Sequence, residues 1–240
     1  MTSSNGEATI LPDYEPARLA IVDDHELSRA GVRDMLMDVS DFEIVGEARD
    51  GLEALELCRH ARPDLVLMDL RMPRMDGLTA TRAIKEEHPE ISVLVMTMHE
   101  NPDYLLRALR AGAAGYILKD ADYEDVVSAI KRVLSGESPL APELAAQLLR
   151  RIALEVRDPE GTSPELKRTT LAQPLTPRET EVLEHLAQGK TNRQIADEFV
   201  ISIGTVKNHV EHVISKLGVS DRTQAVVRAL QLGIISFPEL

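Results

Sequence analysis

Five polar side chains in this chain each stand at the end of a short apolar segment. They are Asp23, Asp24, Asp69, Thr97 and Lys119. Three carboxylates brought together would repel one another unless a cation lay among them, and a hard divalent ion such as Mg²⁺ prefers oxygen ligands. An ammonium and a hydroxyl beside that ion would neutralise and hydrogen-bond the oxygens of a phosphoryl group. The residue types therefore predict a Mg²⁺-dependent phosphoryl-transfer site.

The segments before these residues predict the elements that bring them together. Runs of four to six mostly apolar residues suit strands buried on both faces, and here they are Leu19–Val22, Glu43–Ala48, Leu65–Met68, Ser92–Met96 and Gly115–Leu118. Amphipathic helical patterns separate them. Alternating strands and helices predict an α/β fold with a doubly wound, five-stranded parallel sheet. Because ligands bind beyond the carboxyl ends of such strands, all five polar groups should meet at one edge.

Charge and composition divide the chain. The net charge of −13 argues by itself against a nucleic-acid binder, but residues 1–170 carry 20 Lys and Arg against 32 Asp and Glu, whereas residues 171–240 carry 7 against 8. We expect a flexible tail over 1–17, a first domain over 18–136, a polar linker with a short helix over 137–174, and a second domain over 175–240. The chain contains no apolar run of membrane-spanning length and no signal peptide, which predicts a cytoplasmic protein with no membrane partner.

The second domain has an all-helical pattern. Thr176 to Glu179 and Thr191 to Gln194 are two capping boxes, and Ser202 can begin a third helix that ends near Gly218. Either Ser220 or Asp221 can cap a fourth. Four short helices, two of them joined by a tight turn, predict a helix-turn-helix domain.

Residues 18–136 resemble the receiver domain of bacterial two-component response regulators, which has a flavodoxin-like fold. The matching stretches are IVDDH, LVLMDLRMPRMDG, VLVMT and GYILKD. The resemblance implies that Asp69 is the phosphoacceptor of a sensor histidine kinase and that Thr97 and Lys119 hold the phosphoryl oxygens. It also implies that Mg²⁺ is bound by Asp24 and Asp69 directly, by Asp23 often through water, and by the backbone carbonyl of Arg71. Tyr116 matches the switch aromatic residue of the family. The match with Thr97 favours this role over the alternative of a half-buried strand tyrosine.

Residues 175–235 resemble the LuxR-type helix-turn-helix domain of the NarL/FixJ family through LTPRETEVLEHLAQGKTNRQIA and GTVKNHVEHVISKLGV. The resemblance implies that the helix over about 203–217 enters the DNA major groove. The expected DNA contacts are Thr205, Lys207 and Asn208, with backbone contacts from Lys190, Arg193, Lys216 and Arg222. Glu211 would either accept from cytosine or point away from DNA.

A homodimer on two half-sites would supply the affinity that one nearly neutral domain lacks. The resemblance places the dimer contact at Ala225, Val226 and Ala229, although these small apolar residues could equally be buried within one domain. We expect the dimer to form on phosphorylation.

Together these features predict a phosphorylation-switched, DNA-binding transcription factor. It would be no enzyme beyond a phosphoacceptor with slow self-dephosphorylation. A phosphatase with an aspartate nucleophile would need an acid at position 71, where this chain has Arg71. The alternative is a helix-turn-helix regulator that binds DNA independently of phosphorylation.

Overall fold

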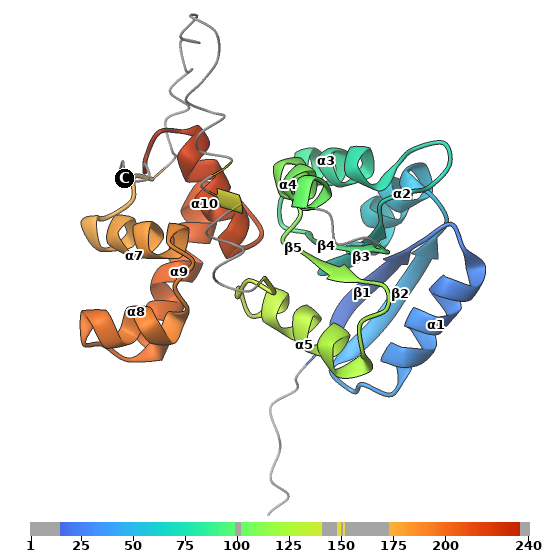
Figure 1. Ribbon diagram of the computed structural model, residues 1–240, viewed down its shortest axis with the longest axis horizontal. Helices are drawn as coiled ribbons and strands as arrows, with labels where there is room; N and C mark the ends of the chain where they lie inside the picture. Colours follow the sequence, from blue (N-terminus) through green and yellow to red (C-terminus); the bar gives the residue numbers. More distant parts are fainter. Residues whose placement is uncertain (1–14, 99–101, 141–147, 150, 152–172, 236–240) are drawn as a thin grey trace, which may run out of the picture.

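The computed structural model describes residues 15–98, 102–140, 148–149, 151 and 173–235 (Figure 1). The predicted tail up to residue 14, and nearly all of the predicted linker helix, lie outside these residues. Within the described part of the chain, no helix is long and apolar enough to cross a membrane.

The N-terminal domain is built on one parallel sheet in the order β2-β1-β3-β4-β5. Its strands are β1 (Ala17–Val22), β2 (Phe42–Ala48), β3 (Leu65–Asp69), β4 (Ser92–Thr97) and β5 (Gly115–Leu118). Its helices are α1 (Glu26–Met37), α2 (Gly51–Ala61), α3 (Gly77–Glu87), α4 (Pro102–Ala111) and α5 (Tyr123–Leu134). The predicted doubly wound sheet is confirmed, and every predicted strand overlaps an observed one.

Alternate residues of each central strand enter two separate cores. Leu19 and Leu67 pack with α1 and α5 on one face of the sheet, whereas Val66 and Val95 pack with α2, α3 and α4 on the other. Burial on both faces explains why these strands are continuous apolar runs rather than alternating ones. The polar side chains that follow the strands are therefore left at one edge of the sheet.

The loop after β3 depends on a glycine. A Cβ atom at Gly77 would collide with the backbone carbonyl oxygen of Asp69, while the Gly77 N–H donates to the Leu70 carbonyl at 3.0 Å. Only glycine permits this close approach of the α3 N-terminus to the end of β3. The loop that follows Asp69 is thereby held beside that residue.

The C-terminal domain consists of α7 (Pro177–Ala187), α8 (Asn192–Phe199), α9 (Ile203–Leu217) and α10 (Arg222–Gln231). Both predicted capping boxes are present, at Thr176 and Thr191. Ser202 caps α9, and Asp221 rather than Ser220 accepts from the Gln224 N–H to cap α10. Apolar faces of all four helices share one core.

Candidate functional site

The three acids meet at the carboxyl edge of the sheet, as predicted. Asp23, Asp24 and Asp69 each offer an oxygen, and these oxygens lie within 4.8 Å of one another. Asp23 and Asp69 are buried, whereas Asp24 is exposed. Three oxygen donors so close together, with one side open to solvent, fit a hard divalent cation such as Mg²⁺.

Lys119 from the end of β5 joins two of these acids. Its Nζ donates to Asp23 Oδ2 at 2.6 Å and lies 3.0 Å from Asp69 Oδ1. Burial opposes the charge of Lys119, but its bonds to Asp23 and Asp69 outweigh burial and raise its pKa above the ordinary value. For Asp69, burial is the largest influence and raises its pKa despite Lys119. The site thus holds the Lys119 ammonium beside the Asp69 carboxylate, whose ionised form is disfavoured by burial.

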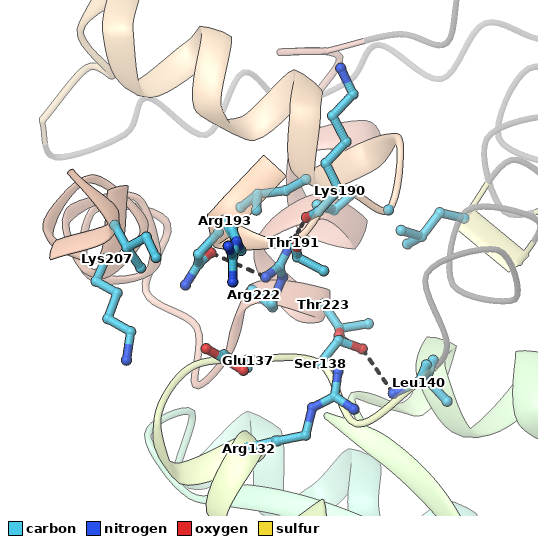
Figure 2. A pocket seen from close by; sticks show the side chains of 16 residues that line it. Arg132, Glu137, Ser138, Leu140, Lys190, Thr191, Arg193, Lys207, Arg222 and Thr223 are labelled. Atoms are coloured by element: carbon cyan, nitrogen blue, oxygen red, sulfur yellow. Dashed lines mark hydrogen bonds between the residues drawn. The ribbon is translucent and has the colours of Figure 1, made fainter. Parts of the chain in front are cut away.

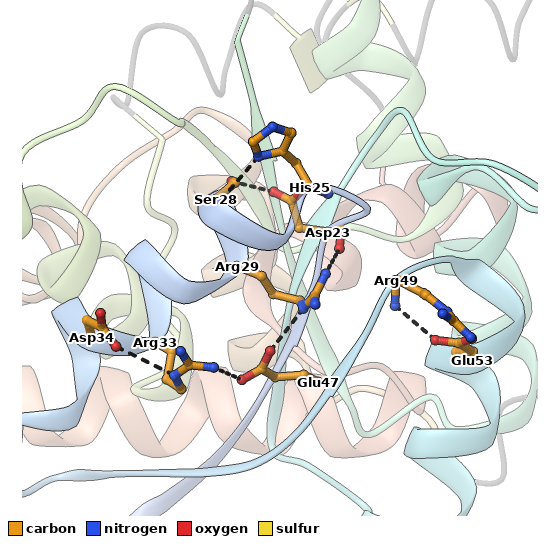
Figure 3. A network of polar contacts seen from close by, with 9 residues as sticks. All are labelled: Asp23, His25, Ser28, Arg29, Arg33, Asp34, Glu47, Arg49 and Glu53. Atoms are coloured by element: carbon orange, nitrogen blue, oxygen red, sulfur yellow. Dashed lines mark hydrogen bonds and ion pairs between the residues drawn. The ribbon is translucent and has the colours of Figure 1, made fainter.

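Sequence reasoning missed the groups that fix Asp23. Its carboxylate accepts from the Ser28 hydroxyl at 2.6 Å and from the His25 N–H at 2.8 Å (Figure 3). The Arg29 guanidinium donates to the Asp23 carbonyl at 2.8 Å and also pairs with Glu47 on β2. These contacts join α1 and β2 to the acid cluster, and only the folded arrangement shows them.

The other predicted residues of this site lie as follows. Thr97 is buried at the end of β4, and its carbonyl accepts from the Lys119 N–H at 2.8 Å. Tyr116 is half-buried on β5 and packs against two hydrophobic clusters, one of which extends into the C-terminal domain. Arg71 lies in the loop directly after β3 and Leu70. Thr97 and Lys119 therefore share the strand-end edge with the acids.

Most predicted DNA contacts lie on the outside of the C-terminal domain. Thr205, Asn208 and Arg193 are exposed, and Lys207 and Lys190 are half-exposed. Residues of both domains line a cavity of about 420 Å³, among them Arg193 and Lys207 of the C-terminal domain and Arg132 and Glu137 of the N-terminal half. Figure 2 shows these side chains, with the Lys190 ammonium pointing away from Arg132 and Glu137. Part of the predicted DNA-backbone surface therefore faces the N-terminal domain in this structure. Glu211 is exposed on α9.

Three predicted backbone contacts have other partners here. Lys190 Nζ donates to Glu198 Oε2 at 2.6 Å. Lys216 donates to Glu179 Oε2 at 2.7 Å, which joins α9 to α7. Arg222 is buried and donates to the Lys190 carbonyl at 2.6 Å, and burial lowers its pKa to about 10. In this arrangement Lys216 and Arg222 contact oxygens of their own domain, and their predicted contacts with DNA stay predictions.

The first turn of α10 docks on the N-terminal domain. The Gln224 side-chain amide donates to the Leu109 carbonyl at 3.1 Å and to the Ala113 carbonyl at 2.6 Å. Beside it, Lys85 Nζ donates to the Ser220 hydroxyl at 2.6 Å. The Ser220 hydroxyl in turn donates to Asp221 at 2.7 Å. Polar contacts of α10 and the turn before it with α3, the end of α4 and the turn before β5 therefore link the two domains.

An apolar contact surrounds these hydrogen bonds. Leu105, Leu106 and Leu109 of α4 belong to the same buried cluster as the core of the C-terminal domain, and α10 lies on the side of that domain that faces α4 (Figure 1). The residues predicted as the dimer contact, Ala225, Val226 and Ala229, are all buried in this cluster. In this arrangement they are covered by their own domain and by α4, and the predicted dimer contact stays a prediction.

Comparison with known proteins matches both domains. Residues 19–131 match the response regulator receiver domain, and residues 173–229 match the bacterial regulatory proteins of the luxR family. The chain is 38% identical to the transcriptional regulatory protein DegU of Brevibacillus brevis, over 90% of this chain and 94% of DegU. It is 40% identical to the response regulator protein VraR of Staphylococcus aureus, over 91% of this chain and 98% of VraR. A solved structure of two RcsB dimers bound to two parallel DNAs is 26% identical, with a TM-score of 0.50 over 91% of this chain and 100% of that chain. This chain therefore belongs to the response regulators that join a receiver domain to a LuxR-type DNA-binding domain, and it is a transcription factor.

Proposed function

We propose that Asp69 accepts a phosphoryl group from a sensor histidine kinase in the cytoplasm. An oxygen of Asp69 forms a bond to phosphorus as the bond from phosphorus to the kinase histidine nitrogen breaks. The observation that supports this role is the placement of Asp69 between two acids and Lys119, whose ammonium lies 3.0 Å from its carboxylate. Lys119 and Thr97 would then hold the phosphoryl oxygens.

The residues around Asp69 also suit a Mg²⁺ site. We expect Asp24 and Asp69 to bind the ion directly, Asp23 to bind it through water, and the Arg71 carbonyl to complete the set. When bound, the ion offsets the charge of the phosphoryl oxygens. The chain has no second acid at position 71 to activate water, so self-dephosphorylation should be slow.

We further propose that phosphorylation releases the DNA-binding domain. Movement of Thr97 toward the phosphoryl group leaves space for Tyr116 to turn inward, and Tyr116 packs against the cluster that joins α4 to α10. A shift of α4 would misalign the Leu109 and Ala113 carbonyls with Gln224. Once α10 is free, two chains pair as a homodimer and bind double-stranded DNA through Thr205, Lys207 and Asn208, with Lys190 and Arg193 on the phosphates. The dimers named for RcsB on DNA support this last step by analogy.

The assignment of Asp69 is tested by phosphorylation of the full chain with a small phosphodonor and Mg²⁺. Intact-mass measurement should show one phosphoryl group on the wild-type chain and none on Asp69→Asn. Peptide mapping should locate the group on Asp69. Stoichiometric labelling of the variant would overturn the assignment.

A further inference from the structure

Both oxygens of Asp23 are already hydrogen-bonded by this chain. Oδ1 accepts from the His25 N–H at 2.8 Å, and Oδ2 accepts from the Ser28 hydroxyl at 2.6 Å (Figure 3). Oδ2 also accepts from Lys119 Nζ at 2.6 Å. Asp23 is 4% exposed, so these donors are the main stabilisation of its charge. Burial favours the neutral form, but the bonds from Lys119, Ser28 and His25 outweigh it and keep the pKa of Asp23 below its ordinary value.

The two donors to Asp23 Oδ2, Ser28 and Lys119, differ in whether they also contact Asp69. Lys119 also contacts Asp69 at 3.0 Å, and a phosphoryl group on Asp69 would draw its ammonium toward the new oxygens. Asp23 would then lose its strongest donor at the moment when the site carries the most negative charge. Ser28 has no such competing role toward Asp69.

Ser28 is also held firmly in place. It lies in the first turn of α1, and its N–H donates to His25 Nδ1 at 3.4 Å. The next residue, Arg29, donates to the Asp23 carbonyl at 2.8 Å and to Glu47 at 2.9 Å. The turn from Asp23 to Arg29 is thus closed by side-chain and backbone contacts that do not involve Lys119.

From these contacts we propose that Ser28 is a positioning residue of the metal site. Its hydroxyl keeps the Asp23 carboxylate oriented toward Asp24 and Asp69 when Lys119 turns to the phosphoryl group. This inference rests on the proposed function, because it assumes that Mg²⁺ and a phosphoryl group occupy the acid cluster. Groups that orient metal-binding residues typically change metal affinity by about 10–100-fold when removed.

The test is Mg²⁺ titration of the full chain by calorimetry, without and with beryllium fluoride as the phosphoryl analogue. Ser28→Ala should weaken Mg²⁺ binding about tenfold with the analogue present, and less without it, when Lys119 still holds Asp23. Ser28→Thr keeps the hydroxyl and should bind like the wild type. Ser40→Ala, at an exposed serine after α1, is the matched control.

Ser28→Ala should fold, because alanine is favourable in a helix and Ser28 is only half-buried. Thermal unfolding in EDTA checks this. Equal Mg²⁺ affinity of Ser28→Ala and wild type with the analogue, or tighter binding by Ser28→Ala, would overturn the inference. Equal weakening in Ser28→Ala and Ser28→Thr would overturn it too, because packing and not the hydroxyl would then matter. Absence of Mg²⁺ binding by the wild-type chain would instead contradict the proposed function.

Discussion

Replacement of Gln224 by alanine should activate the unphosphorylated chain. The variant removes two hydrogen bonds, to the Leu109 and Ala113 carbonyls, from a side chain that is 8% exposed. Each such bond contributes about 0.5–1.5 kcal/mol net, so the docked arrangement should lose about 1–3 kcal/mol. That free energy corresponds to about a 5–150-fold rise in the ratio of released to docked chains.

The assay is DNA binding by the unphosphorylated full chain, on a duplex selected from random sequence by the analogue-bound wild type. Gln224→Ala should bind more tightly than the wild type by up to that factor, since only released chains bind. With beryllium fluoride the two proteins should bind equally, which shows that α10 itself is intact. Gln231→Ala, on the exposed side of the same helix, is the control. Equal binding by unphosphorylated Gln224→Ala and wild type would refute the idea that this contact restrains the domain.

Three other variants test separate parts of the site. Asp24→Ala should weaken Mg²⁺ binding by at least about tenfold while the domain stays folded, and unchanged affinity in a calorimetric titration would place the metal elsewhere. Asp69→Asn should raise the unfolding temperature in EDTA at neutral pH. Burial raises the pKa of Asp69, so the ionised acid destabilises the fold as pH rises through that pKa, and the gain should vanish in acid, where Asp69 is protonated. Lys207→Ala should weaken DNA binding by about 1–3 kcal/mol if Lys207 contacts a base, or lower the salt dependence of binding by about one if it contacts phosphate. If the variant shows no change of either kind, α9 does not enter the groove.

The sheet and its polar edge could be predicted because local patterns determine them. Strands buried on both faces must be apolar along their length, and parallel strands bring their following residues to one edge. Asp23, Asp69 and Lys119 therefore meet in space although 96 positions separate the first from the last. Local patterns also located the caps of α7 and α8, from capping residues three positions apart, and that of α9, from Ser202.

Contacts between distant segments could not be predicted in this way. Gln224 and Lys85 are ordinary polar side chains on amphipathic helices, and only the docking of α10 gives them partners 111 and 135 positions away. Arg222 and Lys216 carry the charge expected of DNA-binding residues, but here they donate hydrogen bonds to a carbonyl and a carboxylate of their own domain. Ser28 had no signal beyond its place five positions after Asp23.

In the proposed switch, a phosphoryl group on Asp69 releases α10 from the receiver domain. The most direct measurement compares the oligomeric state and DNA affinity of the full chain with and without beryllium fluoride and Mg²⁺, alongside Asp69→Asn. We expect a monomer that binds DNA weakly without the analogue, a dimer that binds tightly with it, and no response in Asp69→Asn. If the wild-type chain shows the same oligomeric state and the same DNA affinity in both conditions, the claim is contradicted, and the protein is a regulator that binds DNA independently of phosphorylation.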